Sequence, residues 1–123
     1  MMQLNIFSKV APLCKEKSYD YSSLIEFFNK YYKSKDYIYP SAVHRKLLID
    51  IRDIYDFLEV CVSEQIVTQY FEIYCPICNR YTNNIYSEFS SIPNVVHCIN
   101  CDENNNGEIV NPSKFAVIIY MVN

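Results

Sequence analysis

The chain has 123 residues, half of them hydrophobic and a fifth charged, which is typical of a folded domain and excludes a wholly disordered protein. Its single glycine excludes the glycine-rich loops that bind nucleotide phosphates, because those motifs need more than one glycine. The formal net charge is −3, yet residues 1–48 carry eight Lys and Arg against four Asp and Glu, whereas residues 49–123 carry three against ten. We expect both parts to be solvated; the alternative is that the basic and acidic faces meet different partners.

The chain shows no sign of a leader or of a membrane span. Its first residues contain no basic region followed by a long apolar run, and the longest apolar run, residues 115–122, is too short to cross a bilayer. We therefore expect a cytoplasmic protein that does not associate with membranes. In that compartment thiols stay reduced, and clustered cysteines bind metal more often than they pair.

Three helices are predicted after an irregular segment, residues 1–18, in which Pro12 interrupts any early helix. The first helix covers residues 19–34, the second covers residues 41–48 after Pro40, and the third runs from Asp50, its N-cap, to about residue 65. In the first helix, side chains at helical spacing predict a core-facing stripe of Tyr21, Leu24, Ile25, Phe28, Tyr31 and Tyr32. The corresponding stripe of the third helix is Ile51, Ile54, Tyr55, Leu58, Cys61 and Val62, and that of the second is Val43 and Leu47.

Two strands are predicted from runs of β-branched and aromatic residues. The first covers residues 66–74 and leads directly into Cys75, and the second covers residues 115–122. The second run is apolar at every position, so both of its faces must be covered. We expect it to be an interior strand, or an edge strand that another chain covers.

Four of the six cysteines form two CxxC pairs, Cys75–Cys78 and Cys98–Cys101, with 19 residues between the pairs. This spacing is typical of a structural zinc site, because each tight turn aims two sulfur atoms at one ion and two turns complete a tetrahedron. Asn79 and Asp102 follow the two pairs, where a left-handed backbone is often needed. The sequence therefore predicts one structural Zn²⁺ bound by Cys75, Cys78, Cys98 and Cys101. Two disulfides or four unrelated thiols are the alternatives.

The two histidines and the other two cysteines of the chain are not needed for the metal site. His97 precedes Cys98 and could replace a ligand, but four cysteines already satisfy a metal, so an ordinary strand or loop residue is expected. His44 is expected on a solvated face of the second helix. Cys61 is expected in the core and Cys14 has no partner at metal-site spacing. A redox CxxC is disfavoured because no βαβ pattern surrounds either pair.

Three helices, a strand and then CPIC and CINC resemble a winged-helix module joined to a zinc ribbon. This organisation is similar to the large subunit of transcription factor E and its archaeal relative, and to small accessory proteins of bacterial operons. The resemblance implies an α+β fold in which a three-helix winged-helix-like part, residues 19–74, packs on a small antiparallel zinc ribbon, residues 75–123. The helical part of the pattern is generic, whereas the cysteine pattern is specific.

The third helix departs from DNA-binding members of that group, which carry basic and amide side chains there. Its charged residues are Asp50, Arg52, Asp53, Asp56, Glu59 and Glu64, and such a surface repels phosphates. We therefore expect a non-enzymatic interaction module, a small subunit or adaptor of a regulatory or defence assembly that binds a protein partner or itself. The alternative is a DNA- or RNA-binding regulator that uses the basic N-terminal part, with candidate contacts Lys30, Lys33, Lys35, Arg45 and Lys46. An enzyme is disfavoured because no catalytic motif is present.

Overall fold

The computed structural model of the chain describes residues 5–14, 20–101 and 107–123. Backbone contacts divide the chain into two units. The helical unit comprises residues up to Thr68 together with Tyr120–Asn123, and the cysteine unit comprises Gln69–Ile119. The C-terminal strand, which we placed with the zinc ribbon, thus ends within the helical unit.

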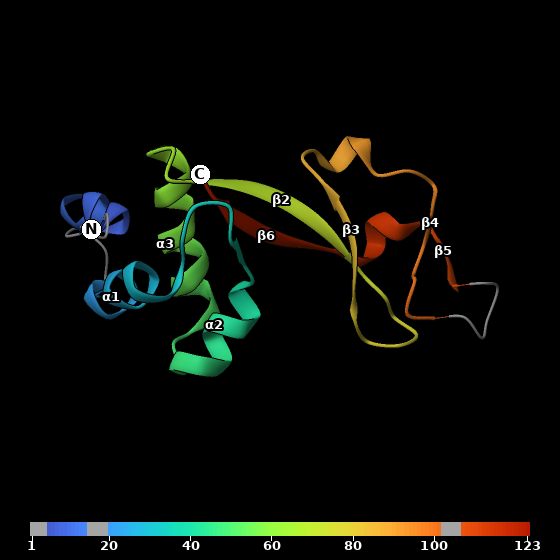
Figure 1. Cartoon of the computed structure of the whole chain (residues 1–123), viewed down its shortest axis with the longest axis horizontal. Helices are drawn as coiled ribbons and strands as arrows, with labels where there is room; N and C mark the ends of the chain where they lie inside the picture. Colours follow the sequence, from blue (N-terminus) through green and yellow to red (C-terminus); the bar gives the residue numbers. More distant parts are fainter. Residues whose placement is uncertain (1–4, 15–19, 102–106) are drawn as a thin grey trace. The chain divides into compact units, whose positions relative to one another are not determined.

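The three predicted helices are confirmed: α1 (Ser22–Tyr31) and α3 (Ile51–Ser63) are slightly shorter than predicted, and α2 (Pro40–Leu47) begins and ends one residue earlier (Figure 1). Local chemistry explains where they begin and end. Pro40 opens α2 with a preset φ, and Leu48 ends it in a left-handed conformation with φ 57°. The Asp50 carboxylate accepts a hydrogen bond from the backbone N–H of Arg52 at 2.9 Å and so caps α3, as predicted.

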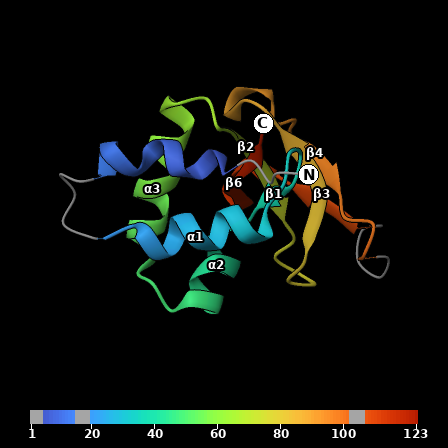
Figure 2. The same ribbon diagram turned by 60° about the vertical axis from the view of Figure 1, so that its left-hand side comes forward.

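A 3₁₀ helix, η1, covers Ile6–Cys14, where we expected an irregular segment. Pro12 is tolerated there because short i→i+3 turns lose only one donor to it, and Phe7, Val10 and Cys14 bury the inner side. Figure 2 shows η1 running alongside α1 and α3, the two helices it contacts. Asn29 of α1 ties it in place, since its Oδ1 accepts from the N–H of Phe7 and its Nδ2 donates to Ser8 Oγ, both at 3.0 Å.

The helical unit has a core of stacked aromatic rings. Phe28 and Phe57 are fully buried, and their rings are nearly parallel with centroids 5.4 Å apart. Phe7 stacks on Phe28 at 5.2 Å. Of the predicted stripe on α1, the residues Tyr21, Leu24 and Phe28 are buried, but the prediction is wrong for Tyr31, which is 56% exposed. The stripe ends early because α1 stops at Tyr31 and the chain becomes extended at Tyr32.

The larger sheet is antiparallel in its assigned pairs, with the strand order β1-β6-β2-β3. Its strands are β1 (Tyr37–Ile38), β2 (Val67–Tyr74), β3 (Tyr81–Tyr86) and β6 (Ala116–Val122). The strands β2 and β6 correspond to the two predicted strands. As expected from its uniformly apolar sequence, β6 is an interior strand, with β1 on one side and β2 on the other.

A second, two-stranded sheet lies within the cysteine unit. It pairs β4 (Val95–His97) with β5 (Glu108–Val110), with Val96 opposite Ile109. Short 3₁₀ turns, η2 (Phe89–Ser91) and η4 (Pro112–Phe115), flank this sheet along the chain. The fold is α+β with antiparallel sheets, as predicted, whereas the winged-helix and zinc-ribbon resemblance stays a prediction. Within the described residues, no helix combines the length and the apolar character that crossing a bilayer requires.

Candidate metal centre

The sulfur atoms of Cys75, Cys78, Cys98 and Cys101 all lie within 4.8 Å of one another. The Cys75 and Cys101 sulfurs are 3.7 Å apart, and those of Cys78 and Cys98 are 3.6 Å apart. A tetrahedral zinc ion with Zn–S bonds of about 2.3 Å places its ligands about 3.8 Å from one another. The four predicted residues therefore converge with the donor type and spacing of a tetrahedral thiolate site, and all six cysteines of the chain are free of disulfides.

The first pair lies in the turn that joins β2 to β3. The N–H of Cys75 donates to the carbonyl of Arg80 at 2.8 Å, and the N–H of Asn79 donates to the carbonyl of Cys75 at 3.0 Å. Asn79 has a φ of 58°, which confirms the predicted left-handed residue after the second cysteine. Asparagine tolerates this conformation better than other residues with a side chain, so the turn forms without a glycine.

The second pair is closed by the chain's single glycine. The N–H of Cys98 donates to the carbonyl of Gly107 at 2.7 Å, and the N–H of Cys101 donates to the carbonyl of Cys98 at 3.2 Å. Gly107 has a φ of +73°, and a Cβ placed there would overlap the carbonyl oxygens of Cys98 and Cys101. Only glycine fits this position. Asp102, for which we predicted a left-handed position, lies outside the described residues.

The cluster lies in a small apolar core. Ile73 of β2, Val96 of β4 and Ile109 of β5 are buried against the cysteines, and Phe115 and Ala116 pack on them. Cys75 and Cys98 are almost fully buried, whereas Cys78 is only partly buried. These apolar neighbours exclude water, which strengthens the attraction between thiolates and a cation.

The thiol pKa values indicate that the cluster resists carrying four negative charges by itself. Burial opposes ionisation of Cys75, but the N–H groups of Cys78 and Ile77 and the adjacent thiols outweigh it and lower its pKa to about 7. Burial and the neighbouring sulfur atoms raise the pKa of Cys98, and raise that of Cys101 to about 12. A divalent cation would offset this repulsion and hold all four thiols deprotonated.

The remaining histidines and cysteines lie where we expected them. His97 is an exposed residue of β4, and its carbonyl accepts a hydrogen bond from Asn84 at 3.0 Å. His44 is exposed on α2, with Nδ1 2.6 Å from the carbonyl oxygen of Ile49. Cys61 is fully buried in the helical core. Burial raises the pKa of its thiol above the ordinary value, so the thiol is poorly reactive. Cys14 is buried as well.

The candidate nucleic-acid contacts are all exposed on the helical unit: Lys30, Lys33, Lys35, Arg45 and Lys46. The structure brings part of this set to one place. Lys46 lines a groove between α1 and α2 together with Tyr31, and Lys30 holds its Nζ 5.3 Å from the centroid of the Tyr31 ring. The sequence analysis missed this groove because it assigned Tyr31 to the core.

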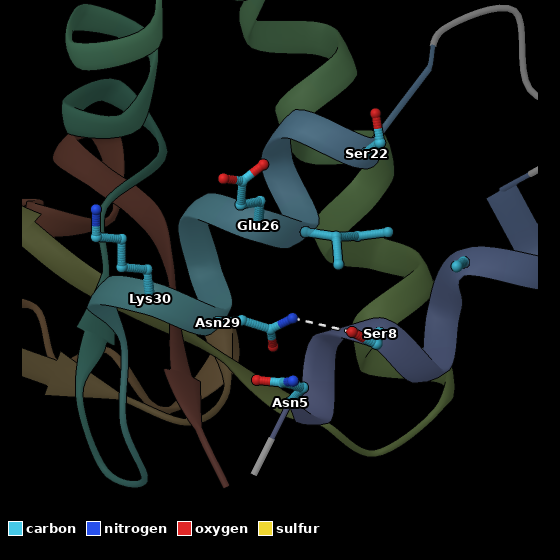
Figure 3. Close-up of a pocket in the computed structure, with 8 residues that line it drawn as sticks. Asn5, Ser8, Ser22, Glu26, Asn29 and Lys30 are labelled. Atoms are coloured by element: carbon cyan, nitrogen blue, oxygen red, sulfur yellow. Dashed lines mark hydrogen bonds between the residues drawn. The ribbon is translucent and has the colours of Figure 1, made fainter. Parts of the chain in front are cut away.

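A second hollow of about 470 Å³ lies between η1 and α1. Its polar lining includes Asn5, Ser8, Glu26 and Asn29, and Figure 3 shows the Asn29 side chain turned toward Ser8. None of the described residues that line it is a histidine or a cysteine. Asn29 joins η1 to α1 here through its hydrogen bonds with Phe7 and Ser8.

Comparison of the chain with family models, with curated proteins and with solved structures finds no match.

Proposed function

We propose that this chain is a zinc-stabilised, non-catalytic interaction module that serves as a small subunit or adaptor in a regulatory or defence assembly. The cluster of four cysteine sulfurs, three of them from buried residues, carries the proposal. Four thiolates fill the coordination sphere of Zn²⁺ and leave no position for water or substrate, which is the arrangement of structural rather than catalytic zinc. The ion would hold together β2, β3 and the β4–β5 sheet.

The exposed surface of the cysteine unit supports a protein partner. Four aliphatic side chains there are open to solvent: Ile77, Val95, Ile99 and Val110. Val95 and Val110 lie directly opposite each other on β4 and β5, on the face away from the buried Val96 and Ile109. The exposed valine pair of β4 and β5, and the exposed isoleucines within the two CxxC turns, favour contact with another protein.

The interior position of β6 makes this strand a less favourable element for self-association. We expected this strand to be interior or to be covered by another chain; it is interior, and β1 pairs with it at Tyr120 and Met121. The acidic α3 also disfavours the duplex-binding mode that a winged-helix resemblance implies, because Asp53, Asp56 and Glu59 would face phosphates. A protein partner at the exposed aliphatic residues therefore fits the chain better than duplex DNA.

Two measurements test the proposal. Metal analysis of the purified chain should find one zinc ion per chain, and a content well below one contradicts the structural role. Affinity capture from the native host, with mass spectrometry, should recover a protein partner that Ile99→Asp and Val110→Asp release. Leu48→Asn is the matched control, since Leu48 is an exposed aliphatic residue of the helical unit at a left-handed position that asparagine accepts. A partner retained by both aspartate variants contradicts this surface.

A further inference from the structure

A groove of about 440 Å³ lies on the helical unit between α1 and α2. Its lining combines aromatic rings, two small aliphatic side chains and one cation: Phe27, Tyr31, Tyr32, Ala42, Val43 and Lys46. Most of these residues are at least partly exposed, so the groove is open to solvent. It lies in the basic part of the chain and is separate from the cysteine cluster, which belongs to the other unit.

The aromatic rings of the groove form a connected group. The Phe27 ring lies 5.1 Å from that of Tyr31 and 6.0 Å from that of Tyr32. Tyr31 is the most exposed of them, at 56% of its surface, and it ends α1 without a place in the core. A large ring held by a neighbouring ring and open to solvent can receive a planar group by stacking.

Two cations lie close to these rings, and a third precedes one of them on α2. Lys30 lies over the Tyr31 ring, Lys46 lines the groove, and Arg45 precedes Lys46 on α2. Within residues 5–14, 20–101 and 107–123, an ion pair is found between Arg52 and Asp50. Lys30, Arg45 and Lys46 take part in no ion pair among these residues, so their charges stay available for a ligand. One acid lies near the groove: burial, and after it the charge of Asp36, raise the pKa of Tyr32, and the Asp36 carboxylate accepts the N–H of Lys33 at 2.8 Å.

We propose that this groove binds single-stranded nucleic acid, with a base stacked on Tyr31 and phosphates near Lys30 and Lys46. Aromatic rings interleaved with cations suit unpaired bases, because every base offers a flat face and every nucleotide a phosphate. A duplex hides its base faces, so it would use the cations but not the rings. This inference goes beyond the proposed function: the basic helical face would hold nucleic acid while the cysteine unit contacts protein.

The experiment is a fluorescence anisotropy titration of the zinc-loaded full chain with labelled oligothymidylate and oligouridylate of about 15 nucleotides, at low salt. We expect binding whose log K falls with log[salt] by about 0.7 for each phosphate contact. Tyr31→Ala should weaken binding about 5- to 100-fold, the range for loss of one stacked base, while Tyr31→Phe retains it. Lys30→Ala and Lys46→Ala should each reduce the salt slope by about 0.7.

Matched controls come from the cysteine unit. Phe89→Ala removes a ring with nearly the same exposure as Tyr31, and Lys114→Ala removes an exposed cation, and neither should change binding. Circular dichroism and zinc content confirm that each variant is folded. Because Tyr31 and the two lysines are exposed, their variants should remain folded.

Three outcomes overturn the proposal. One is no binding of either oligonucleotide at low salt. Another is equal affinity for a duplex of the same length, with Tyr31→Ala unaffected. The last is binding of labelled polyglutamate as tight as that of oligothymidylate, which would make the groove a site for acidic protein segments. None of these outcomes alters the zinc content or the release of a partner by Ile99→Asp, so the proposed function fails or stands separately.

Discussion

The helical unit and the cysteine unit build their cores from different chemistry. In the helical unit, rings from η1, α1 and α3 stack on one another, with Phe7, Phe28 and Phe57 fully buried. In the cysteine unit, three of the six buried residues in the core cluster are cysteines, and the others are Ile73, Val96 and Ile109. A core this small supplies little hydrophobic stabilisation, so under the proposed function this unit would depend on a bound ion, where the helical unit depends on packing.

The largest expected effect follows from removing one ligand of the cluster. Cys75→Ser should abolish zinc binding and unfold the cysteine unit, because structural zinc sites contribute about 10 kcal/mol or more to folding. Far-ultraviolet circular dichroism should still report helix, since the helical core contains none of the four ligands. Metal analysis and near-ultraviolet circular dichroism measure the loss. Cys14→Ala is the control, and a Cys75→Ser protein that retains one zinc per chain would refute the site.

Truncating the aromatic stack should have the next largest effect. Phe57→Ala removes a fully buried ring that contacts both Phe28 and Tyr21, and it should cost about 3–5 kcal/mol in the free energy of unfolding. Urea unfolding followed by circular dichroism at a helical wavelength measures this loss, with zinc content unchanged. Leu13→Ala, at a half-exposed site on η1, should cost well under half as much. Equal losses in the two variants would show that the stack is not the core of this unit.

The single glycine allows a finer test of the cysteine unit. Gly107→Ala forces a Cβ against the carbonyl oxygens of Cys98 and Cys101 at a positive φ, so we expect a loss of about 2 kcal/mol or more and weaker zinc binding. A competition titration with a zinc chelator measures the affinity. Asn79→Gly, at the left-handed position of the first pair, should leave the affinity within about twofold. If Gly107→Ala binds zinc as tightly as Asn79→Gly, the close approach at Gly107 is unimportant.

The smallest expected effect is a pH dependence of the helical unit. Burial and the hydrogen bond that Tyr120 Oη donates to Glu59 at 2.7 Å raise the pKa of Tyr120 above its ordinary value of 10.0. The neutral phenol is thus favoured in the folded state. Its contribution to the free energy of unfolding is complete below pH 10 and declines as the pH rises beyond that value. The slope should be at most about 1.4 kcal/mol per pH unit for this group.

Tyr120→Phe removes that titration and should flatten the alkaline decline, although it also loses the hydrogen bond to Glu59 at every pH. Urea unfolding at several pH values above 9 distinguishes the slope from the constant loss. Cys61 contributes a similar decline, because burial also raises its pKa, so Cys61→Ala in combination should flatten the curve further. An unchanged slope in both variants would contradict the assignment.

Much of the candidate site could be predicted because its signals are local. The spacing of Cys75, Cys78, Cys98 and Cys101 predicts convergence on one ion, and the structure places the four sulfurs together. The left-handed Asn79 was predictable too, because the turn imposes its φ. The role of Gly107 was not, since its constraint comes from the carbonyls of Cys98 and Cys101, which approach it only once the second turn has folded.

The sequence by itself determined the three helices, the strands β2 and β6 and the metal-ligand set, because periodicity, capping by Asp50 and CxxC spacing act over a few residues. The tertiary structure decided the rest. It formed η1 despite Pro12, because burial of Phe7 and Val10 outweighs one lost donor. It ended the core stripe before Tyr31 and opened the α1–α2 groove, because exposure depends on which neighbours pack against a side chain and not on its spacing alone.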